Sequence, residues 1–215
     1  RVKGKTNDTA VEIENYEERP SWAPNINFNL YRGSVELVYN EKDTKTWAVN
    51  EIGVESYLRG LGEAGNNNDE DYLKALVTAA RTYSMILYLH PTKYAGRPYI
   101  MGDTSADQVY KGYAYETRVP NIVKAVEDTR GKVVTYQGNI VVTPYFSRSD
   151  GRTRSWDEVW AGSRAWLKSV PDPCCTESTL WGHGVGMSAQ GALYFAGEGK
   201  SWDWILHYYY TDIEI

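Results

Sequence analysis

A long amphipathic helix is the feature of this sequence that most constrains its fold. Six residues recur at helical spacing and form one face, namely Leu73, Leu76, Val77, Ala80, Ser84 and Leu87. Acidic residues at 69–71 lie where the helix dipole favours negative charge, and Asn68 or Asp69 can cap the first turn. Pro91 ends the pattern. The face is small at its centre, which lets another element approach closely, and Arg81 lies on its flank.

Strand patterns occur on both sides of this helix. Six segments are predicted as strands, at 11–13, 34–39, 46–49, 132–136, 140–146 and 165–170. The second and third of these form a hairpin around the turn at 40–43. The fourth and fifth form another, in which Pro144 favours an edge or a bulge.

Four shorter helices are predicted, at 54–61, 121–129, 188–195 and 202–209. Residues 92–120 are predicted to be rich in loops. Because hairpins and separate helices are mixed without regular alternation, the pattern indicates an α+β fold with an antiparallel or mixed β-sheet. A partly irregular N-terminal arm is expected over 1–31, followed by one domain over 32–215.

Composition narrows the classes of protein. The chain has 215 residues, enough to bury a core, and 23 basic against 28 acidic side chains without a basic stripe. We therefore expect no nucleic-acid surface. No apolar run approaches the length of a membrane span, so membrane attachment is expected only through a segment missing from this chain. The chain opens on Arg1 and is interpreted as a processed piece, so the lack of a signal sequence says nothing about localisation.

The aromatic and cysteine content is unusual. There are 18 Tyr and 8 Trp but only 3 Phe. Tyr and Trp combine an apolar face with a polar group, which suits carbohydrate or peptide surfaces as well as partly hydrated cores. The only cysteines, Cys174 and Cys175, are adjacent, and a ring between neighbours is strained, so we predict two free thiols.

The strongest local signal for chemistry is the glycine-rich segment 181–192, which contains His183 and leads into a predicted helix. Glycines let the backbone approach a ligand, and free N–H groups at a helix start attract oxygen-rich groups. The segment is neither a Walker loop nor a serine elbow. Two interpretations stay open, a ligand-binding loop and a packing turn with His183 as a core imidazole.

Other candidates are weaker. Asp103 and Asp107 could share a metal ion, but without nearby His or Cys a polar turn is favoured. Segment 145–153 is rich in hydroxyls and cations, and is interpreted either as a solvated loop or as a rim that binds sugar or acyl groups. His90 is expected to cap a helix end, and His207 is given no role.

Four segments, at 54–64, 74–83, 103–110 and 182–192, together resemble the SpoIID/LytB family in order and spacing, over roughly residues 32–212. That family includes sporulation lytic transglycosylases and amidase enhancers. The resemblance implies helices and hairpins packed around a substrate cleft, an extracytoplasmic location and peptidoglycan glycan strands as the ligand. It also names a cell-wall amidase as a candidate partner, and it implies no cofactor.

The resemblance assigns the family's catalytic acid to Glu63. It implies that Gly62 and Ala64 are small so that a glycan strand can reach this carboxyl at the floor of a cleft. A lone acid suffices for a lytic transglycosylase. It protonates the bridging oxygen and then acts as base while the muramic acid hydroxyl closes an anhydro ring, so no second carboxylate is needed. Burial should raise its pKa above about 4.3.

Arg81 is a candidate either to orient the Glu63 carboxyl or to contact the sugar. The candidates for the cleft wall, as hydrogen-bond donors to hydroxyl and acetamido groups, are Gln108, Tyr110, Ser147, His183, Ser188 and Gln190. Since a guanidinium lowers the pKa of a nearby acid, Arg81 is expected slightly away from Glu63. Some family members bind zinc through a cysteine pair where this chain has Gly102 and Asp107, so we expect no metal there. Ser147 and Asp150 also depart from the family's usual His and Gly, which changes the rim of the cleft.

Three functional hypotheses follow. The first is a peptidoglycan lytic transglycosylase that uses Glu63. The second is a non-catalytic amidase enhancer or glycan-binding module. The third, a hydrolase using Ser188 with His183 or a metal on the two aspartates, lacks both the serine elbow and a full ligand set.

Overall fold

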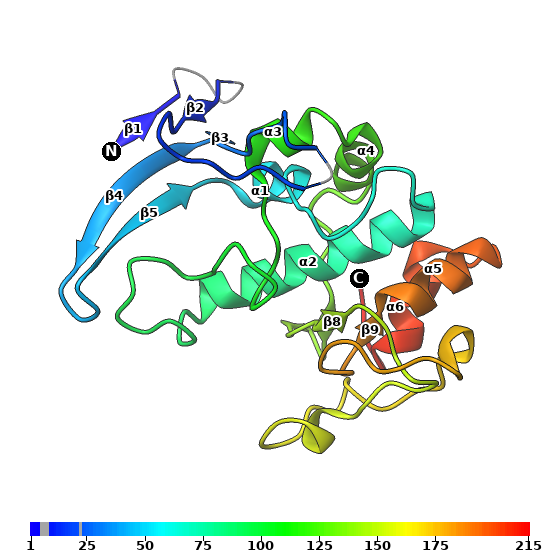
Figure 1. Ribbon diagram of the computed structural model, residues 1–215. Helices are drawn as coiled ribbons and strands as arrows, with labels where there is room; N and C mark the ends of the chain where they lie inside the picture. The colour runs from blue at the N-terminus through cyan, green and yellow to red at the C-terminus, as the bar shows by residue number, and fades with distance from the viewer. Residues whose placement is uncertain (5–8, 22) are drawn as a thin grey trace. The chain divides into compact units, whose positions relative to one another are not determined.

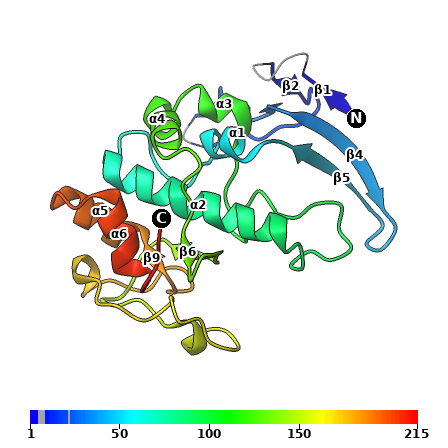
Figure 2. The ribbon, with the colours of Figure 1, turned by 180° about the vertical axis from the view of Figure 1, so that it is seen from behind.

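The computed structural model describes residues 1–4, 9–21 and 23–215 (Figures 1 and 2). These residues form two compact units, each built from two chain segments. The first unit contains Arg1–Asn66 and Leu87–Glu127, and the second contains Asn67–Ile86 and Asp128–Ile215. The described part of the predicted arm, 1–31, lies within the first unit, while its residues 5–8 and 22 lie outside the described residues.

The first unit contains two antiparallel sheets. Strands β1 (Val2–Lys3), β4 (Ser34–Asn40) and β5 (Lys45–Glu51) form one sheet in the order β1-β4-β5, and β2 (Val11–Glu12) pairs with β3 (Leu30–Tyr31). The hairpin predicted around 40–43 is therefore confirmed. Figure 1 shows it as a long curved ribbon.

The helices of the first unit are α1 (Val54–Arg59), α3 (Gly112–Glu116) and α4 (Pro120–Asp128), whose last residue belongs to the second unit. The first and last confirm the predicted helices, whereas α3 lies in the segment predicted to be loop. A buried ion pair explains its stability. Arg32 donates two hydrogen bonds to Glu116, of 2.7 and 2.9 Å, and so ties α3 to the chain just after β3.

The long helix α2 (Glu70–Leu89) lies mostly in the second unit and confirms the predicted amphipathic helix. The Asp71 N–H donates to the Asp69 carboxylate at 2.9 Å, which caps the first turn. Two hydroxyl contacts attach α2 to later segments. Thr82 Oγ1 accepts from the Val134 N–H at 2.9 Å, and the Thr143 hydroxyl donates to a carbonyl of α2 at 2.8 Å.

The rest of the second unit is made of short elements. They are β6 (Thr135–Tyr136), β7 (Asn139–Ile140), β8 (Tyr145–Phe146), the 3₁₀ turns η1 (Trp156–Glu158) and η2 (Pro173–Cys175), β9 (Met187–Ser188), α5 (Ala189–Gly197) and α6 (Trp202–Tyr209). Both predicted helices are confirmed. The second hairpin is confirmed only near its turn, because β8 instead pairs in parallel with β9. The strand predicted at 165–170 is wrong, since those described residues form turns and irregular backbone.

The prediction of two free thiols is also wrong. Cys174 and Cys175 are joined by a disulfide across a single peptide bond. They lie at the end of η2, whose tight turn brings the neighbouring sulfur atoms within bonding distance. Cys175 is buried, whereas Cys174 is half-buried.

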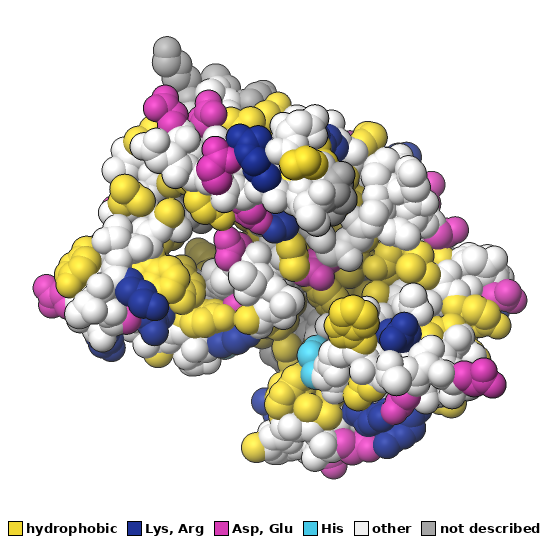
Figure 3. Space-filling view, viewed as in Figure 1, with side chains coloured by type: hydrophobic (Ala, Val, Ile, Leu, Met, Phe, Trp, Pro, Cys, Tyr) yellow, Lys and Arg dark blue, Asp and Glu magenta, His cyan; other side chains and the backbone are white. Residues whose placement is uncertain are grey.

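The surface shown in Figure 3 carries acidic and basic side chains close to one another. Among the described residues, no helix is both long enough and apolar enough to cross a bilayer.

A buried polar cluster in the second unit yields a stability prediction. The Asp172 carboxylate accepts from the Ser149 hydroxyl at 2.7 Å and the Tyr209 hydroxyl at 2.9 Å. A Cβ at Gly191 would lie 1.9 Å from Asp172 Oδ1 and 2.0 Å from the Tyr209 oxygen, so Gly191→Ala must disrupt the cluster. We expect a loss of about 1–3 kcal/mol in the free energy of unfolding, measured by urea denaturation.

Gly197 in the same helix is the matched control, because a Cβ there would meet no atom within 4 Å. Gly197→Ala should be neutral or stabilise by up to about 1 kcal/mol, since alanine favours helix over glycine. Equal effects of the two substitutions would contradict the account.

Candidate active site

Glu63 lies on a short segment that pairs with another part of the first unit. The Gly62 N–H donates to the Val109 carbonyl, and the Lys111 N–H donates to the Gly60 carbonyl, both at 2.8 Å. Leu61 and Tyr110 face each other in an antiparallel bridge between these contacts. This pairing, which we call the Glu63 ladder (residues 60–62 and 109–111), fixes the backbone that leads to the acid.

The Glu63 carboxylate is half-buried and accepts a short hydrogen bond from the Val109 N–H through Oε1. Two effects act on its pKa in opposite directions. Burial disfavours the charged form and raises the pKa, while the Val109 amide stabilises the charged form and lowers it. Burial is the larger effect, so the pKa of Glu63 lies above the usual value for glutamate.

The structure gives Gly62 a packing role. A Cβ at this position would lie 2.9 Å from Lys111 Cγ and 3.2 Å from Val109 Cγ1. Glycine is therefore needed for the two segments of the Glu63 ladder to approach each other, whatever substrate the site accepts. Gly62, Ala64 and Gly65 also line a pocket beside the acid.

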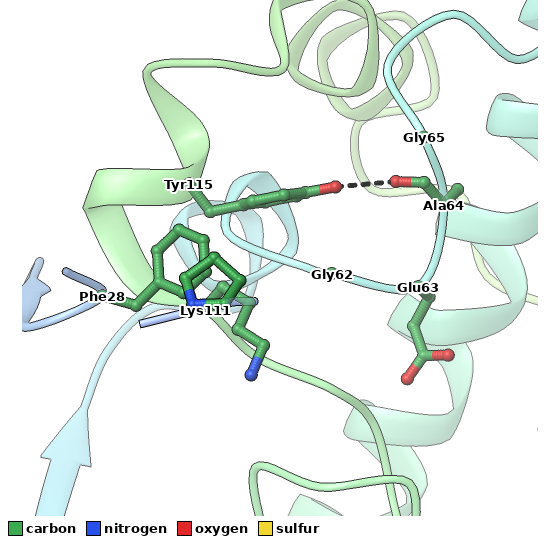
Figure 4. Close-up of a pocket in the computed structure, with 8 residues that line it drawn as sticks. Phe28, Gly62, Glu63, Ala64, Gly65, Lys111 and Tyr115 are labelled. Carbon is green, nitrogen blue, oxygen red and sulfur yellow. Dashed lines mark hydrogen bonds between the residues drawn. The ribbon is translucent and has the colours of Figure 1, made fainter. Parts of the chain in front are cut away.

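That pocket has a volume of about 380 Å³ and lies entirely within the first unit (Figure 4). Its lining residues are Pro20, Phe28, Gly62, Glu63, Ala64, Gly65, Lys111 and Tyr115. Two of them, Pro20 and Phe28, come from the N-terminal arm. The Lys111 ammonium forms an ion pair with the Glu18 carboxylate, which also belongs to the arm. The arm is thus part of the candidate site.

Tyr115 supports the acid from a second side. Its hydroxyl donates to the Ala64 carbonyl at 2.8 Å, as the dashed line in Figure 4 shows, and its ring packs edge-on against Phe28. Burial raises the pKa of the Tyr115 hydroxyl, which keeps it a hydrogen-bond donor. The sequence analysis missed Tyr115, Lys111 and Phe28, because no local pattern links them to Glu63.

Two residues predicted to contact substrate, Gln108 and Tyr110, belong to the first unit. Tyr110 is part of the Glu63 ladder, and Gln108 directly precedes the ladder in the chain. Gln108 is fully buried, and its Oε1 accepts from the Tyr57 hydroxyl at 2.9 Å. The Tyr110 ring is nearly buried and lies 4.9 Å from the Tyr57 ring. In this structure both side chains support the Glu63 ladder, and their contact with substrate stays a prediction.

Asp107 closes the loop that leads to Val109. Its fully buried carboxylate accepts from the Tyr94 hydroxyl at 2.6 Å and from the Gly102 N–H at 2.8 Å, and it pairs with the Lys93 ammonium. The hydrogen bond to Asp107 raises the pKa of Tyr94 to about 12. The carboxylate therefore serves as a hydrogen-bond acceptor within the loop.

Arg81 belongs to the second unit and is almost completely buried. Its guanidinium donates to Thr129 Oγ1 at 3.3 Å and to the Lys132 carbonyl at 3.1 Å, which ties α2 to the turn after α4. The side chain is not exposed to a ligand in this structure. Its predicted role in substrate binding stays a prediction.

The remaining predicted residues cluster at the β8–β9 pair of the second unit. Ser147 and Gln190 are exposed, and the Gln190 N–H donates to the Ser147 carbonyl at 3.1 Å. His183 is half-buried, and burial lowers its pKa. The centre of its ring lies 5.6 Å from that of Phe146 and 4.9 Å from that of Trp160. The structure therefore brings Ser147, His183 and Gln190 to one region.

Ser188 has a different environment. It is fully buried, and its Oγ accepts from the Gly191 N–H at 3.1 Å as the N-cap of α5. A buried helix cap is poorly suited to attack a substrate carbonyl, so this geometry does not favour the serine hydrolase hypothesis.

One group of side chains has a composition suited to a metal ion. The ligand atoms of Asp172, Cys174 and Cys175 lie within 4.8 Å of one another. However, thiolates bind metals, and in this structure the two sulfur atoms are bonded to each other. The group is therefore not a metal site in its oxidised form.

Comparisons with known proteins add independent information. Residues 42–136, which include Glu63, Arg81, Gln108 and Tyr110, match the family model of SpoIID, the stage II sporulation protein. The chain is 32% identical over 142 residues to the stage II sporulation protein D of Bacillus subtilis (strain 168), covering 60% of this chain and 41% of that protein.

The chain is also 40% identical over 104 residues to an amidase enhancer of the same organism, covering 47% of this chain and 13% of that protein. An uncharacterized protein of Brachyspira hyodysenteriae (strain ATCC 49526 / WA1) is 30% identical over 193 residues, covering 81% of this chain and 50% of that protein. This chain thus spans half or less of the length of each of these relatives.

The raised pKa of Glu63 predicts a pH-dependent effect on stability. Because the folded-state pKa lies above the unfolded-state value, folding takes up a proton between the two values, and the contribution of Glu63 to stability falls as pH rises through that window. We expect the melting temperature of Glu63→Gln, relative to the wild type, to increase from pH 4 to pH 7.5. An unchanging difference across this range would contradict the burial argument.

The Asp107 cluster predicts a second effect. Asp107→Asn retains one acceptor for three donors, so the free energy of unfolding should fall by about 1–3 kcal/mol in urea denaturation. Asp103→Asn, an exposed change in the same loop, should stay within about 0.5 kcal/mol of the wild type. If the two variants are equally stable, the hydrogen bonds of Asp107 do not contribute to the free energy of unfolding.

Proposed function

We propose that this chain, which belongs to the SpoIID/LytB family, is a peptidoglycan lytic transglycosylase. In this proposal it cleaves the bond between N-acetylmuramic acid and N-acetylglucosamine and leaves anhydro-muramic ends. Glu63 acts as the only acid and base. One observation chiefly supports the proposal. The Glu63 carboxyl is half-buried, has a raised pKa, borders a pocket and accepts a hydrogen bond from the Val109 backbone amide.

The raised pKa suits the first half of the reaction. A carboxyl that protonates the bridging oxygen must hold its proton near neutral pH, and burial increases the protonated fraction. Proton transfer to this oxygen lets the glycosidic bond break on the side of the muramic acid. The Lys111 ammonium, which lines the same pocket, is already paired with Glu18.

The Val109 amide suits the second half. Once Glu63 has given up its proton, the carboxylate is stabilised by the Val109 N–H. The carboxylate can then take a proton from the primary hydroxyl of the muramic acid, whose oxygen attacks the anomeric carbon and closes the anhydro ring. The nucleophile belongs to the substrate, so neither a second carboxylate nor an activated water is required.

The alternative is a non-catalytic module that binds glycan or a cell-wall amidase. It is supported by the similarity to a protein named amidase enhancer. A module of this kind has no use for a carboxyl with a raised pKa in a pocket, which is why we place it second.

The proposed location is extracytoplasmic, since peptidoglycan lies outside the cytoplasmic membrane. The disulfide between Cys174 and Cys175 is consistent with this location, because disulfides persist mainly in oxidising compartments.

Digestion of purified glycan strands followed by mass spectrometry tests the proposal. We expect anhydro-muramic ends, and Glu63→Gln should lower the rate by about 10²–10⁴-fold because general acid and base catalysis is lost. Glu41→Gln, an exposed change in the β4–β5 turn, should retain the rate. Ordinary reducing ends would instead indicate a hydrolase, and intact strands that remain bound would favour the binding module.

A further inference from the structure

The second unit contains a cluster of aromatic rings, formed by Trp156, Trp160, His183 and Phe146. The Trp156 and Trp160 rings lie 4.6 Å apart, and the Trp160 ring lies 4.9 Å from His183. The Phe146 ring lies 5.6 Å from that of His183. The ring contacts therefore run from η1 to the strand β8.

Trp181 adjoins this cluster along the chain, because a Cβ at the next residue, Gly182, would lie 2.8 Å from Phe146 Cβ. Trp181 is 68% exposed, and the adjacent Leu180 is 38% exposed. Exposed apolar side chains that lie together in a patch point to an interaction site. The Trp181 backbone is nevertheless held firmly. The Trp181 N–H donates to the Arg148 carbonyl at 2.8 Å, and the Arg148 N–H donates back at 3.2 Å. The ring is thus presented from a paired segment.

Cations accompany the indole rings. The Arg148 guanidinium lies 6.0 Å from the centre of the Trp181 ring and donates to the Thr179 carbonyl and hydroxyl, both at 3.1 Å. The Arg164 guanidinium lies 4.9 Å from the centre of the Trp156 ring. Each of these two indole rings thus has a guanidinium group near it. The exposed Ser147 precedes Arg148 in the chain.

The charges of this region are largely balanced. Arg152 pairs with Glu158, and Arg154 pairs with Asp150. Nucleic acids and anionic membranes need a net basic surface, which these pairs do not provide. A pyranose ring has complementary chemistry, because its C–H groups stack on an indole face while its hydroxyl and acetamido groups accept hydrogen bonds from guanidinium groups.

We propose that Trp181, Arg148 and Trp160 form a sugar-binding face that holds a glycan strand by stacking on its pyranose rings. The choice of ligand rests on the proposed function, whereas the face itself does not depend on the chemistry of Glu63. In this arrangement Trp181 is the main stacking residue, and Arg148 both orients the indole and donates to the sugar.

Titration with chito-tetraose, a soluble oligomer of N-acetylglucosamine, tests the proposal. The full chain carrying Glu63→Gln is used, so that cleavage cannot interfere. We expect the indole N–H signal of Trp181 to shift in NMR spectra. Trp181→Ala should raise the dissociation constant for the oligomer by about tenfold, the effect of losing an important contact residue. Trp181 is mostly exposed, so the truncated variant should still fold.

The matched control is Trp204→Ala, since Trp204 is 37% exposed on α6 and stacks on Tyr208 instead. It should leave the dissociation constant unchanged. Unchanged binding by Trp181→Ala, an equal loss in both variants, or no binding of the oligomer by the parent chain would overturn the proposal. So would saturation of the Trp181 signal shift by vesicles of anionic phospholipid alone.

The two proposals can fail separately. If the parent chain binds the oligomer through Trp181 but the wild type leaves no anhydro-muramic ends, the lytic activity is excluded and the sugar-binding face stands. If the wild type and Trp181→Ala cleave glycan with the same dependence of rate on glycan concentration, the sugar-binding face is excluded and the lytic activity stands.

Discussion

The hydrogen bond from the Val109 amide to the Glu63 carboxyl is the interaction on which the candidate site depends. It exists because the segment after α1 pairs with the segment before α3 in the Glu63 ladder, where Gly62 lets the two chains approach. Burial favours the protonated acid and raises its pKa, while the Val109 amide favours the ionised form. One carboxyl can therefore serve in turn as acid and as base, which is what a lytic transglycosylase requires.

Two supports hold this arrangement from outside the ladder. Tyr115 fixes the Ala64 carbonyl, and Asp107 closes the loop that carries Val109. The Asp107 carboxylate accepts from three donors of the loop itself, those of Lys93, Tyr94 and Gly102. The N-terminal arm adds Phe28 to the pocket, and this residue lies outside the range that matches the family model.

Local patterns predicted the elements whose stability is local. The long helix α2 was predictable from its periodicity and its cap at Asp69, as was the β4–β5 hairpin from alternation around a turn. Helix α3 was not, because it has five residues and depends on Arg32, 84 positions from its partner Glu116. The parallel pairing of β8 with β9 likewise joins distant segments, and the disulfide depends on the turn η2.

The site was only partly predictable, because its contacts also join distant segments of the chain. The family resemblance located Glu63, but residue type alone does not reveal whether a polar side chain will bind substrate or another part of the protein. Gln108 and Ser188 are such cases, since each is buried and bonded within its own unit.

Measuring the Glu63 carboxyl pKa by ¹³C NMR, with the signal assigned through Glu63→Gln, tests the central claim most directly. The account predicts a midpoint clearly above about 4.3, and a midpoint at or below that value would contradict it.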